Sequence, residues 1–365
     1  MFKRILPISV FKNVIMLFLF SLGIISLSAN CLLAAPIINA VSGTISDGKS
    51  ITIQGTGFGT KSPAAPLFWD NFESGNTGQL LSTSPNWDTQ IECAASNNGG
   101  TPSMIFSNEK SYSGTKAAKQ MLFNNLPCWS RTKAGLLGNQ SKIFFSYKYW
   151  IQPGTGDHLK MGRIGGDADV HSMPTVGYTA IAPEYWYAFA DKGIEHPLVY
   201  TGALTNQWVR DDSWAVLSTP NASDGAVQIW RNGVSQYSSV AVNTLNSAAQ
   251  RSNYNQVFLP YYIENGTRTV YIDDVYIDKT LSRVEVCSGS TWSNRGTCEI
   301  QIPTAWSSDG TSITITINKG AFSTDSTARY LYVVDSNGLV SSGKSIIFGI
   351  STGLVPPSNL KILSK

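Results

Sequence analysis

The densest group of reactive side chains lies in the segment HLKMGRIGGDADVH, between positions 158 and 171. Its members are His158, Lys160, Arg163, Asp167, Asp169 and His171. On one extended strand Asp167, Asp169 and His171 would share a face, which suits a metal or a pair of acid–base carboxylates. The segment also suits a polysaccharide lyase, in which Lys160 or Arg163 neutralises a uronate carboxylate and a histidine or tyrosine removes a proton. The alternative is a polar surface loop, because two consecutive glycines interrupt the strand.

Two aromatic runs, EYWYAF and LPYYIEN, are candidate platforms for sugar rings. They supply Tyr185, Trp186, Tyr187, Tyr261 and Tyr262. Sugar rings stack on exposed aromatic faces, while polar side chains bond the sugar hydroxyls. Because alternate residues of a strand face opposite sides, about half of each run is expected to pack into a core instead.

The segments that must position these residues have the pattern of β-strands. Ile313, Ile315 and Ile317 alternate with threonines, and similar runs are separated by glycine, asparagine, aspartate and proline. The Asn232-Gly233 pair predicts a tight hairpin turn. Helical periodicity is almost absent. We therefore expect an all-β fold built from β-sandwiches.

The charge balance excludes one class of partner. Charged residues make up 14% of the chain, and the formal net charge is +3. No cluster of lysine and arginine is present that would attract a phosphate backbone, so we expect no nucleic-acid partner.

The N-terminus has the pattern of a secretion signal. Lys3, Arg4 and Lys12 accompany an apolar run over 14–27, and small residues follow. We expect a signal peptide over 1–29, with a boundary as late as 35, and Cys31 leaves a lipoprotein open. The run is short for a membrane span. The mature chain is therefore expected to lack a span and to be secreted, periplasmic or at the cell surface.

The other four cysteines predict two disulfides in an exported chain. Cys287 and Cys298 flank the loop SGSTWSNRGT, which favours their pairing. Cys93 and Cys128 then pair by elimination. The alternative is free buried thiols, since no spacing typical of a zinc site is present.

Motifs near the two ends of the chain resemble one small domain. Residues 51–61, ITIQGTGFGTK, resemble the opening of an IPT/TIG-type immunoglobulin-like domain, and TAWSSDGTSITITINKGAF and YLYVVDSNGLVSSG resemble its close. The resemblance implies a discontinuous sandwich over 36–66 and 283–349, with Phe58 filling its core. A phosphate-binding loop is excluded, because neither a helix nor Gly-Lys-Ser/Thr follows GTGFG.

Three phrases in the intervening segment resemble another fold. DNFESG, DGAVQIWRNGV and YIDDVYID are similar to phrases of concanavalin A-like and laminin-G-like jelly rolls, including polysaccharide lyases. The resemblance implies a jelly roll over 67–280 that is inserted into the small sandwich and has its first and last strands paired; a tail occupies 351–365. The alternative is two sequential domains that follow an unrelated strand pair. This fold hosts lectins, hydrolases, lyases and adhesion modules, so it names no activity.

Four carboxylates would gather where the terminal strands of that jelly roll pair. They are Asp70, Glu73, Asp273 and Asp274. Related jelly rolls carry a structural cation near such a place, and oxygen-rich clusters suit Ca²⁺. The alternative is a set of solvated edge carboxylates. Asp273 and Asp274 are expected to point to opposite faces, so only one would ligate through its side chain.

Together these features favour a protein that binds a polysaccharide or other glycan through the jelly roll. One alternative is a polysaccharide lyase or glycosidase. The ExDxxE run of laminarinase-like glycosidases and the YxKAGxY run of alginate lyases are missing, so the sequence leans toward binding without catalysis. The other alternative is a non-catalytic adhesion or structural module.

Overall fold

The computed structural model describes residues 34–89, 104–123, 128–165, 175–180, 185–189, 195–200, 204–246, 253–260, 262–349 and 351–352. They form β-strands together with the short 3-10 helices η1 (Leu81–Thr83) and η3 (Trp292–Asn294), which confirms the predicted all-β class. The described residues from 35 onward belong to one compact unit. Within the ranges above, no helix is both long and apolar enough to cross a bilayer.

The small sandwich consists of two antiparallel sheets. One has the order β21 (Ile302–Trp306), β22 (Ser312–Thr316), β2 (Ser50–Thr56), β1 (Ile37–Thr44) and β25 (Ser351–Thr352). The other has the order β20 (Cys298–Ile300), β19 (Arg283–Cys287), β23 (Arg329–Val334) and β24 (Lys344–Ile346). Their alternating apolar residues meet in one core, as the period of two predicts.

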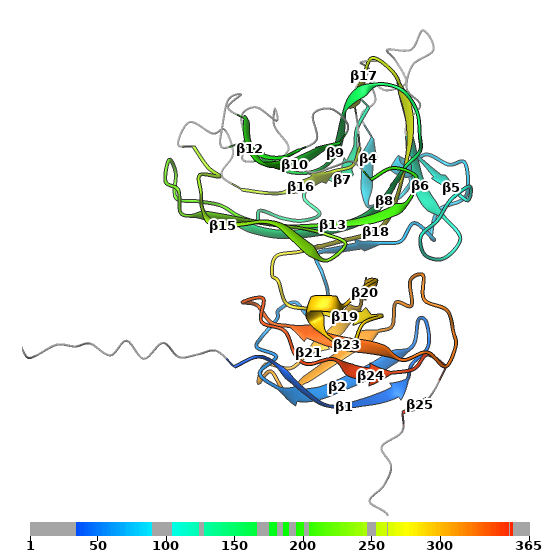
Figure 1. Cartoon of the computed structure of the whole chain (residues 1–365), viewed down its shortest axis with the longest axis vertical. Coiled ribbons are helices and arrows are strands. Elements are labelled where there is room, and N and C mark those ends of the chain that lie inside the picture. The colour runs from blue at the N-terminus through cyan, green and yellow to red at the C-terminus, as the bar shows by residue number, and fades with distance from the viewer. Residues whose placement is uncertain are drawn as a thin grey trace, which may run out of the picture. The chain divides into compact units, whose positions relative to one another are not determined.

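Strands from the two ends of the chain therefore share one sheet (Figure 1). Ile51 is paired with Ile315 and Ile53 with Ile313 across β2 and β22. Phe58 is fully buried in the core of the small sandwich, as predicted. The domain boundaries expected from the sequence stay predictions.

The GTGFG segment, residues 55–59, begins with a close approach of two backbone segments at Gly55. A Cβ at this position would lie 1.9 Å from the carbonyl oxygen of Ile37 and 2.5 Å from the Phe58 ring. No side chain fits in that space, which explains the glycine beside the buried phenylalanine.

The large sandwich consists of two further antiparallel sheets. We call the first the β9 sheet. It has the order β12 (Glu195–Tyr200), β11 (Tyr185–Phe189), β10 (Thr175–Ala180), β9 (Asp157–Gly165), β16 (Gln256–Phe258), β7 (Ser130–Thr132) and β4 (Trp87–Thr89), and β17 (Tyr262–Glu264) also pairs with β9.

We call the second the β8 sheet. It has the order β15 (Val234–Val242), β14 (Gly225–Arg231), β13 (Trp208–Val216), β8 (Lys142–Ile151), β18 (Thr267–Asp278), β6 (Ala117–Phe123) and β5 (Ile105–Ser107), and β3 (Phe68–Asp70) also pairs with β18. Figure 1 shows β13, β15 and β18 in a layer that faces β9, β10 and β16.

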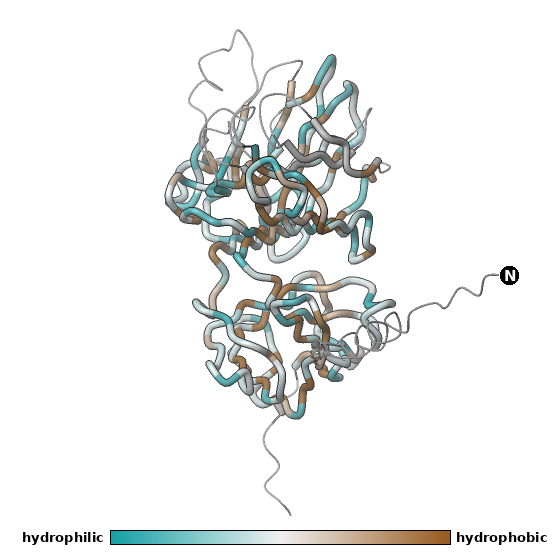
Figure 2. The backbone as a smooth tube through the Cα atoms, turned by 90° about the vertical axis from the view of Figure 1, so that its left-hand side faces the viewer, coloured by the Kyte–Doolittle hydropathy of each residue, from teal (hydrophilic) through white to brown (hydrophobic). Residues whose placement is uncertain are grey.

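A single apolar core fills the space between the β9 and β8 sheets. In the coloured part of the chain, hydrophobic and hydrophilic residues are interleaved along the backbone (Figure 2). The expected pairing of the terminal strands is confirmed, because β3 pairs with β18 and places Asp70 opposite Val275.

Two covalent and local predictions are also met. Cys287 and Cys298 form a disulfide that joins β19 to β20. Cys128 is disulfide-bonded, while Cys93, its predicted partner, lies outside the described residues. Asn232 and Gly233 both have positive φ, at +47° and +79°, and form the hairpin turn between β14 and β15.

Candidate functional site

The candidate site lies on the face of the β9 sheet that points away from the β8 sheet, which we call the outer face. Leu159, Met161 and Ile164 of β9 pack in the core. Strict alternation would not bury both Met161 and Ile164. A register shift between β9 and β10 inserts an extra residue on β9, so that Lys160 and Arg163 are the side chains left for the outer face.

The register then places Arg163 in a row that crosses several strands. Arg163 is opposite Phe258 of β16, and Phe258 is opposite Arg131 of β7. Directly opposed residues of antiparallel strands share a face. The Arg131 guanidinium is 6.0 Å from the centre of the Phe258 ring, and Trp129 packs against the same ring at 5.1 Å. The outer face therefore carries two guanidinium groups with an aromatic ring between them.

Arg131 makes few polar contacts with the described residues. It donates to the side-chain oxygen of Gln256 at 3.4 Å, and among the described residues it forms no ion pair. Its side chain is half-buried, whereas Arg163 is buried. Asp88 of β4 is directly opposite Arg131, but the two side chains form no ion pair, so the guanidinium keeps donors for an anionic ligand.

A second row lies beside the first and contains Lys160. Lys160 is opposite Tyr262 of β17, and its ammonium group is 4.9 Å from the centre of that ring. The Tyr262 hydroxyl donates to Glu264 at 3.4 Å. Burial, followed by the negative charge of Glu264, raises the pKa of Tyr262. A tyrosine with a raised pKa is a poorer general base at neutral pH.

The structure places the remaining predicted residues of the reactive segment as follows. His158 is half-buried near the start of β9, with φ of +50°. Asp167, Asp169 and His171 lie outside the described residues. The proposed shared face of these three therefore stays a prediction.

The register of β10 and β11 places the residues of the first aromatic run along the sheet. Tyr187 is opposite Gly177, which is itself opposite Arg163, and Tyr185 is opposite Thr179 in the row of Lys160. Trp186 is opposite Tyr178, whose side chain is fully buried. Tyr185 and Tyr187 therefore alternate with Trp186 in the register, and their role as sugar platforms stays a prediction. Tyr261 lies outside the described residues.

The four carboxylates predicted to bind calcium each accept hydrogen bonds from the protein. Asp70 accepts from the Trp87 indole at 2.7 Å, and Glu73 accepts from the backbone N–H groups of Thr115 and Lys116. Within the described ranges, no three of the four predicted ligands bring oxygen atoms within 4.8 Å of one another. As arranged, they do not fit a calcium cage, and calcium binding stays a prediction.

Asp273 and Asp274 do not point to opposite faces, contrary to expectation. The backbone N–H of Ser113 donates to Asp273 at 3.1 Å, and its hydroxyl donates to Asp274 at 2.8 Å. The reason is a β-bulge in β18, where Asp274 has φ of +48° and the pairing with β8 shifts register. A bulge turns successive side chains to the same side.

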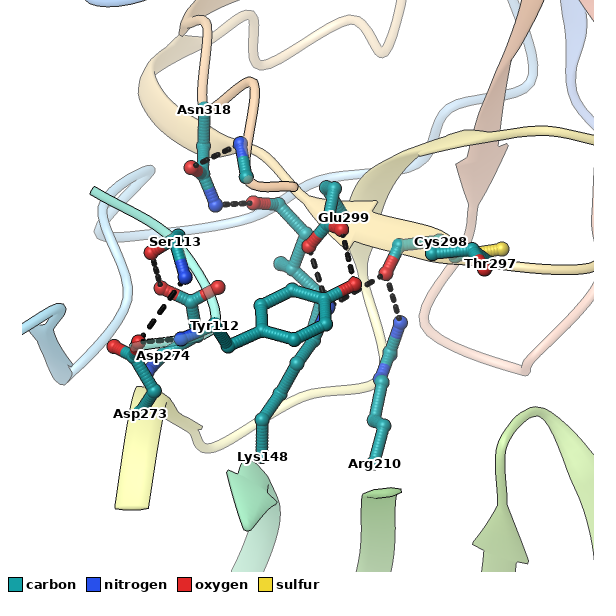
Figure 3. A network of polar contacts seen from close by, with 12 residues as sticks. Tyr112, Ser113, Lys148, Arg210, Asp273, Asp274, Thr297, Cys298, Glu299 and Asn318 are labelled. Atoms are coloured by element: carbon teal, nitrogen blue, oxygen red, sulfur yellow. Dashed lines mark hydrogen bonds and ion pairs between the residues drawn. The ribbon is translucent and has the colours of Figure 1, made fainter. Parts of the chain in front are cut away.

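Sequence reasoning missed a buried polar network next to this bulge (Figure 3). Lys148 of β8 forms an ion pair with Glu299 of β20 at 2.6 Å, and the Tyr112 hydroxyl donates to the same carboxylate at 2.6 Å. Arg210 of β13 bonds Glu285 of β19 at 2.9 Å. These pairs join the β8 sheet to the small sandwich. The partners lie far apart in sequence, so no local pattern could have shown them.

Comparison with known proteins adds one family match. A model of the IPT/TIG domain matches residues 36–117, which include the GTGFG motif. A search of curated proteins found no match.

Several solved structures are similar to part of the chain. An alginate lyase from Aplysia kurodai has 12% identity and a TM-score of 0.43, with 59% of this chain and 99% of that chain covered. The cellulose-induced protein Cip1 has 15% identity and a TM-score of 0.42, with 58% and 97% covered. An endo-β-1,4-glucuronan lyase from Trichoderma reesei has 10% identity and a TM-score of 0.40, with 58% and 95% covered. These identities and TM-scores are too low to support a conclusion about activity.

Proposed function

We propose that the protein binds an acidic polysaccharide along the outer face of the β9 sheet. The observation that carries the proposal is the row in which Arg131 and Arg163 flank Phe258, with Arg131 forming no ion pair with any described carboxylate. Guanidinium groups bind carboxylates through charge-assisted hydrogen bonds. Trp129, which is half-buried and packs on the buried Phe258, offers an apolar face to a sugar ring. A uronate polymer presents both groups at regular intervals.

The raised pKa of Tyr262 favours binding without catalysis. A lyase that used this residue would need its phenolate near neutral pH, whereas burial and Glu264 raise its pKa. The cations of the outer face support recognition of a uronate carboxylate in either case. Turnover by residues outside the described ranges is the second outcome that the experiment must detect.

The test measures binding and turnover together on the full chain. Polygalacturonate and alginate would be compared with a neutral glucan by affinity electrophoresis, while ultraviolet absorbance reports unsaturated uronates. We expect retention on the uronate polymers alone, weakened by added salt. Arg131→Gln and Lys160→Gln should each weaken retention about tenfold, which corresponds to roughly 1.4 kcal/mol.

Lys142→Gln is the matched control, because Lys142 is exposed on the β8 sheet and should leave retention unchanged. Equal retention by the neutral glucan, or no loss in Arg131→Gln and Lys160→Gln, would contradict the proposal. Rising absorbance would instead establish a lyase.

A further inference from the structure

A second cleft lies outside the β9 sheet, where the β8 sheet meets the small sandwich. Its volume is about 360 Å³, within the range of roughly 300–1,000 Å³ that is usual for ligand sites. Its walls include Tyr112, Trp208, Asn232, Arg295 and Thr297. None of these residues belongs to the candidate site described above.

Two aromatic side chains form one wall of the cleft. Tyr112 and Trp208 pack edge to face, with centroids 5.7 Å apart and an angle of 73° between the rings. Tyr112 is held by its hydrogen bond to Glu299, and the ammonium group of Lys148 lies 3.5 Å from its ring centre. Trp208 is half-buried. The wall is therefore fixed in place and offers an apolar surface to a ligand.

Two polar side chains at the cleft have unused hydrogen-bonding capacity. The side-chain oxygen of Asn232 accepts from the backbone N–H of Arg210 at 2.9 Å, which fixes the amide. Its amide nitrogen has no partner in the part of the chain that the structure describes, and neither does the hydroxyl of Thr297. Both residues are exposed. Together they present a donor and a donor–acceptor, the groups that recognise sugar hydroxyls.

The cleft also carries an unneutralised positive charge. Lys148 is paired with Glu299, and Arg210 is paired with Asp212 and Glu285. Arg295 donates to the carbonyl oxygens of Gly233 and Trp292 and stacks on the Trp292 ring at 3.9 Å, but it forms no ion pair with a described residue. These contacts hold a partly buried guanidinium at the cleft, and the carboxylates that act on its charge, Glu285 and Asp212, are already paired with Arg210.

We propose that this cleft binds a sugar acid. The ring would pack on Trp208, its hydroxyls would bond Asn232 and Thr297, and its carboxylate would pair with Arg295. The class follows from the combination, since a neutral sugar leaves Arg295 unmatched and a simple anion leaves the aromatic wall unused. The inference is independent of the proposed function, because it uses a different sheet and different residues.

The test titrates the full chain with galacturonic acid and, in parallel, with galactose, followed by calorimetry or ligand-observed NMR. We expect saturable binding of the acid and much weaker binding of galactose. Trp208→Ala and Arg295→Gln should each weaken binding of the acid by about tenfold. Thr297→Val, which keeps the shape of an exposed side chain, should weaken it by about threefold.

Lys160→Gln is the control that separates the two sites, and it should leave galacturonate binding unchanged. Loss of binding in Lys160→Gln with retention in Trp208→Ala and Thr297→Val would overturn the inference. Failure of the acid to bind, or equal binding of galactose, would also overturn it. Circular dichroism of each variant would confirm that the fold is kept, and Thr297→Val remains informative if Trp208→Ala unfolds.

Discussion

Replacing Glu285 with glutamine tests whether the buried ion pairs hold the β8 sheet to the small sandwich. Glu285 accepts from Arg210 at 2.9 and 3.2 Å and from the Nε atom of Arg283 at 2.6 Å. Its side chain is 1% exposed. Glutamine keeps the volume of the side chain, so the substitution removes the charge without opening a cavity.

The expected loss can be estimated from what each arginine retains. Among the described residues, Arg210 keeps Asp212 at 2.8 Å, whereas Arg283 keeps the Leu281 carbonyl and the face of Phe144. Removing one partner of a buried pair costs about 3–5 kcal/mol. Because one arginine retains a carboxylate, we expect the lower end, about 3 kcal/mol.

Urea unfolding is the assay, followed by tryptophan fluorescence and by circular dichroism to check that both report one transition. With an m-value near 3 kcal/mol per molar, the midpoint should fall by about 1 M. The control is Glu109→Gln, which breaks an equally short ion pair with Lys119 on the surface. The Glu109 side chain is 56% exposed. The substitution should cost less than about 1 kcal/mol. Equal losses for the two variants would refute the reasoning.

The stability lost in Glu285→Gln should depend on pH. Burial alone would raise the pKa of Glu285, but the charges of Arg210 and Arg283 outweigh it and lower the pKa below its ordinary value. A carboxylate with a lowered folded-state pKa contributes stability above its unfolded pKa, about 4.3, and loses it as the pH falls further. The difference between wild type and Glu285→Gln should therefore shrink below about pH 4. A constant difference would contradict this assignment.

Three further outcomes are expected. Replacing Cys287 and Cys298 together should lower the free energy of unfolding by about 2–4 kcal/mol in the urea assay. Adding reductant to the wild type should lower it by at least as much, because the disulfide of Cys128 is reduced as well. Trp87→Phe removes a hydrogen-bond donor to Asp70, whose pKa is raised by burial and lowered in part by this bond. The variant should lose about 1–3 kcal/mol of its free energy of unfolding at neutral pH and less in acid, where the carboxyl group is protonated. A larger loss in acid would contradict the prediction. The Tyr262 ring, and not its hydroxyl, faces Lys160. Tyr262→Phe should therefore keep polysaccharide binding within about twofold, whereas Tyr262→Ala should weaken binding about fivefold in affinity electrophoresis.

Local patterns were sufficient to predict the strands and some of their connections. The alternation around Ile313 and Ile315 marks one face of a strand, and those residues are fully buried. The Asn232-Gly233 turn follows from the positive φ that both positions require. Such signals depend only on neighbouring residues, and a single sequence contains them.

The candidate site was predicted in part for the same reason. Lys160, Arg163 and Tyr262 were selected by residue type, and the structure brings Lys160 beside Tyr262. Arg131 and Phe258 were not selected. They enter the site through strand register, which pairs positions more than a hundred residues apart and leaves no mark in either segment.

Buried charges inside the large sandwich also escaped prediction. Asp211 and Arg231 form an ion pair at 2.9 Å in the interior, beside the Tyr178 ring. In the sequence, Asp211 stands next to Asp212 and has the appearance of a solvated edge. Only the pairing with β14 reveals that Asp211 faces the core. The bulge at Asp274 escaped prediction because it too depends on the pairing with another strand.

The pairing of β2 with β22 has a consequence for the order of events during synthesis. Thr52 and Thr314 lie side by side across these strands, although 262 positions separate them along the chain. The hairpin of β1 and β2 leaves the ribosome long before its neighbour exists, and an unpaired apolar strand is prone to aggregation. Long-range pairing of this kind slows folding. The small sandwich must be completed last, so a chain truncated before residue 312 would keep an exposed strand edge and would be an early target for proteases.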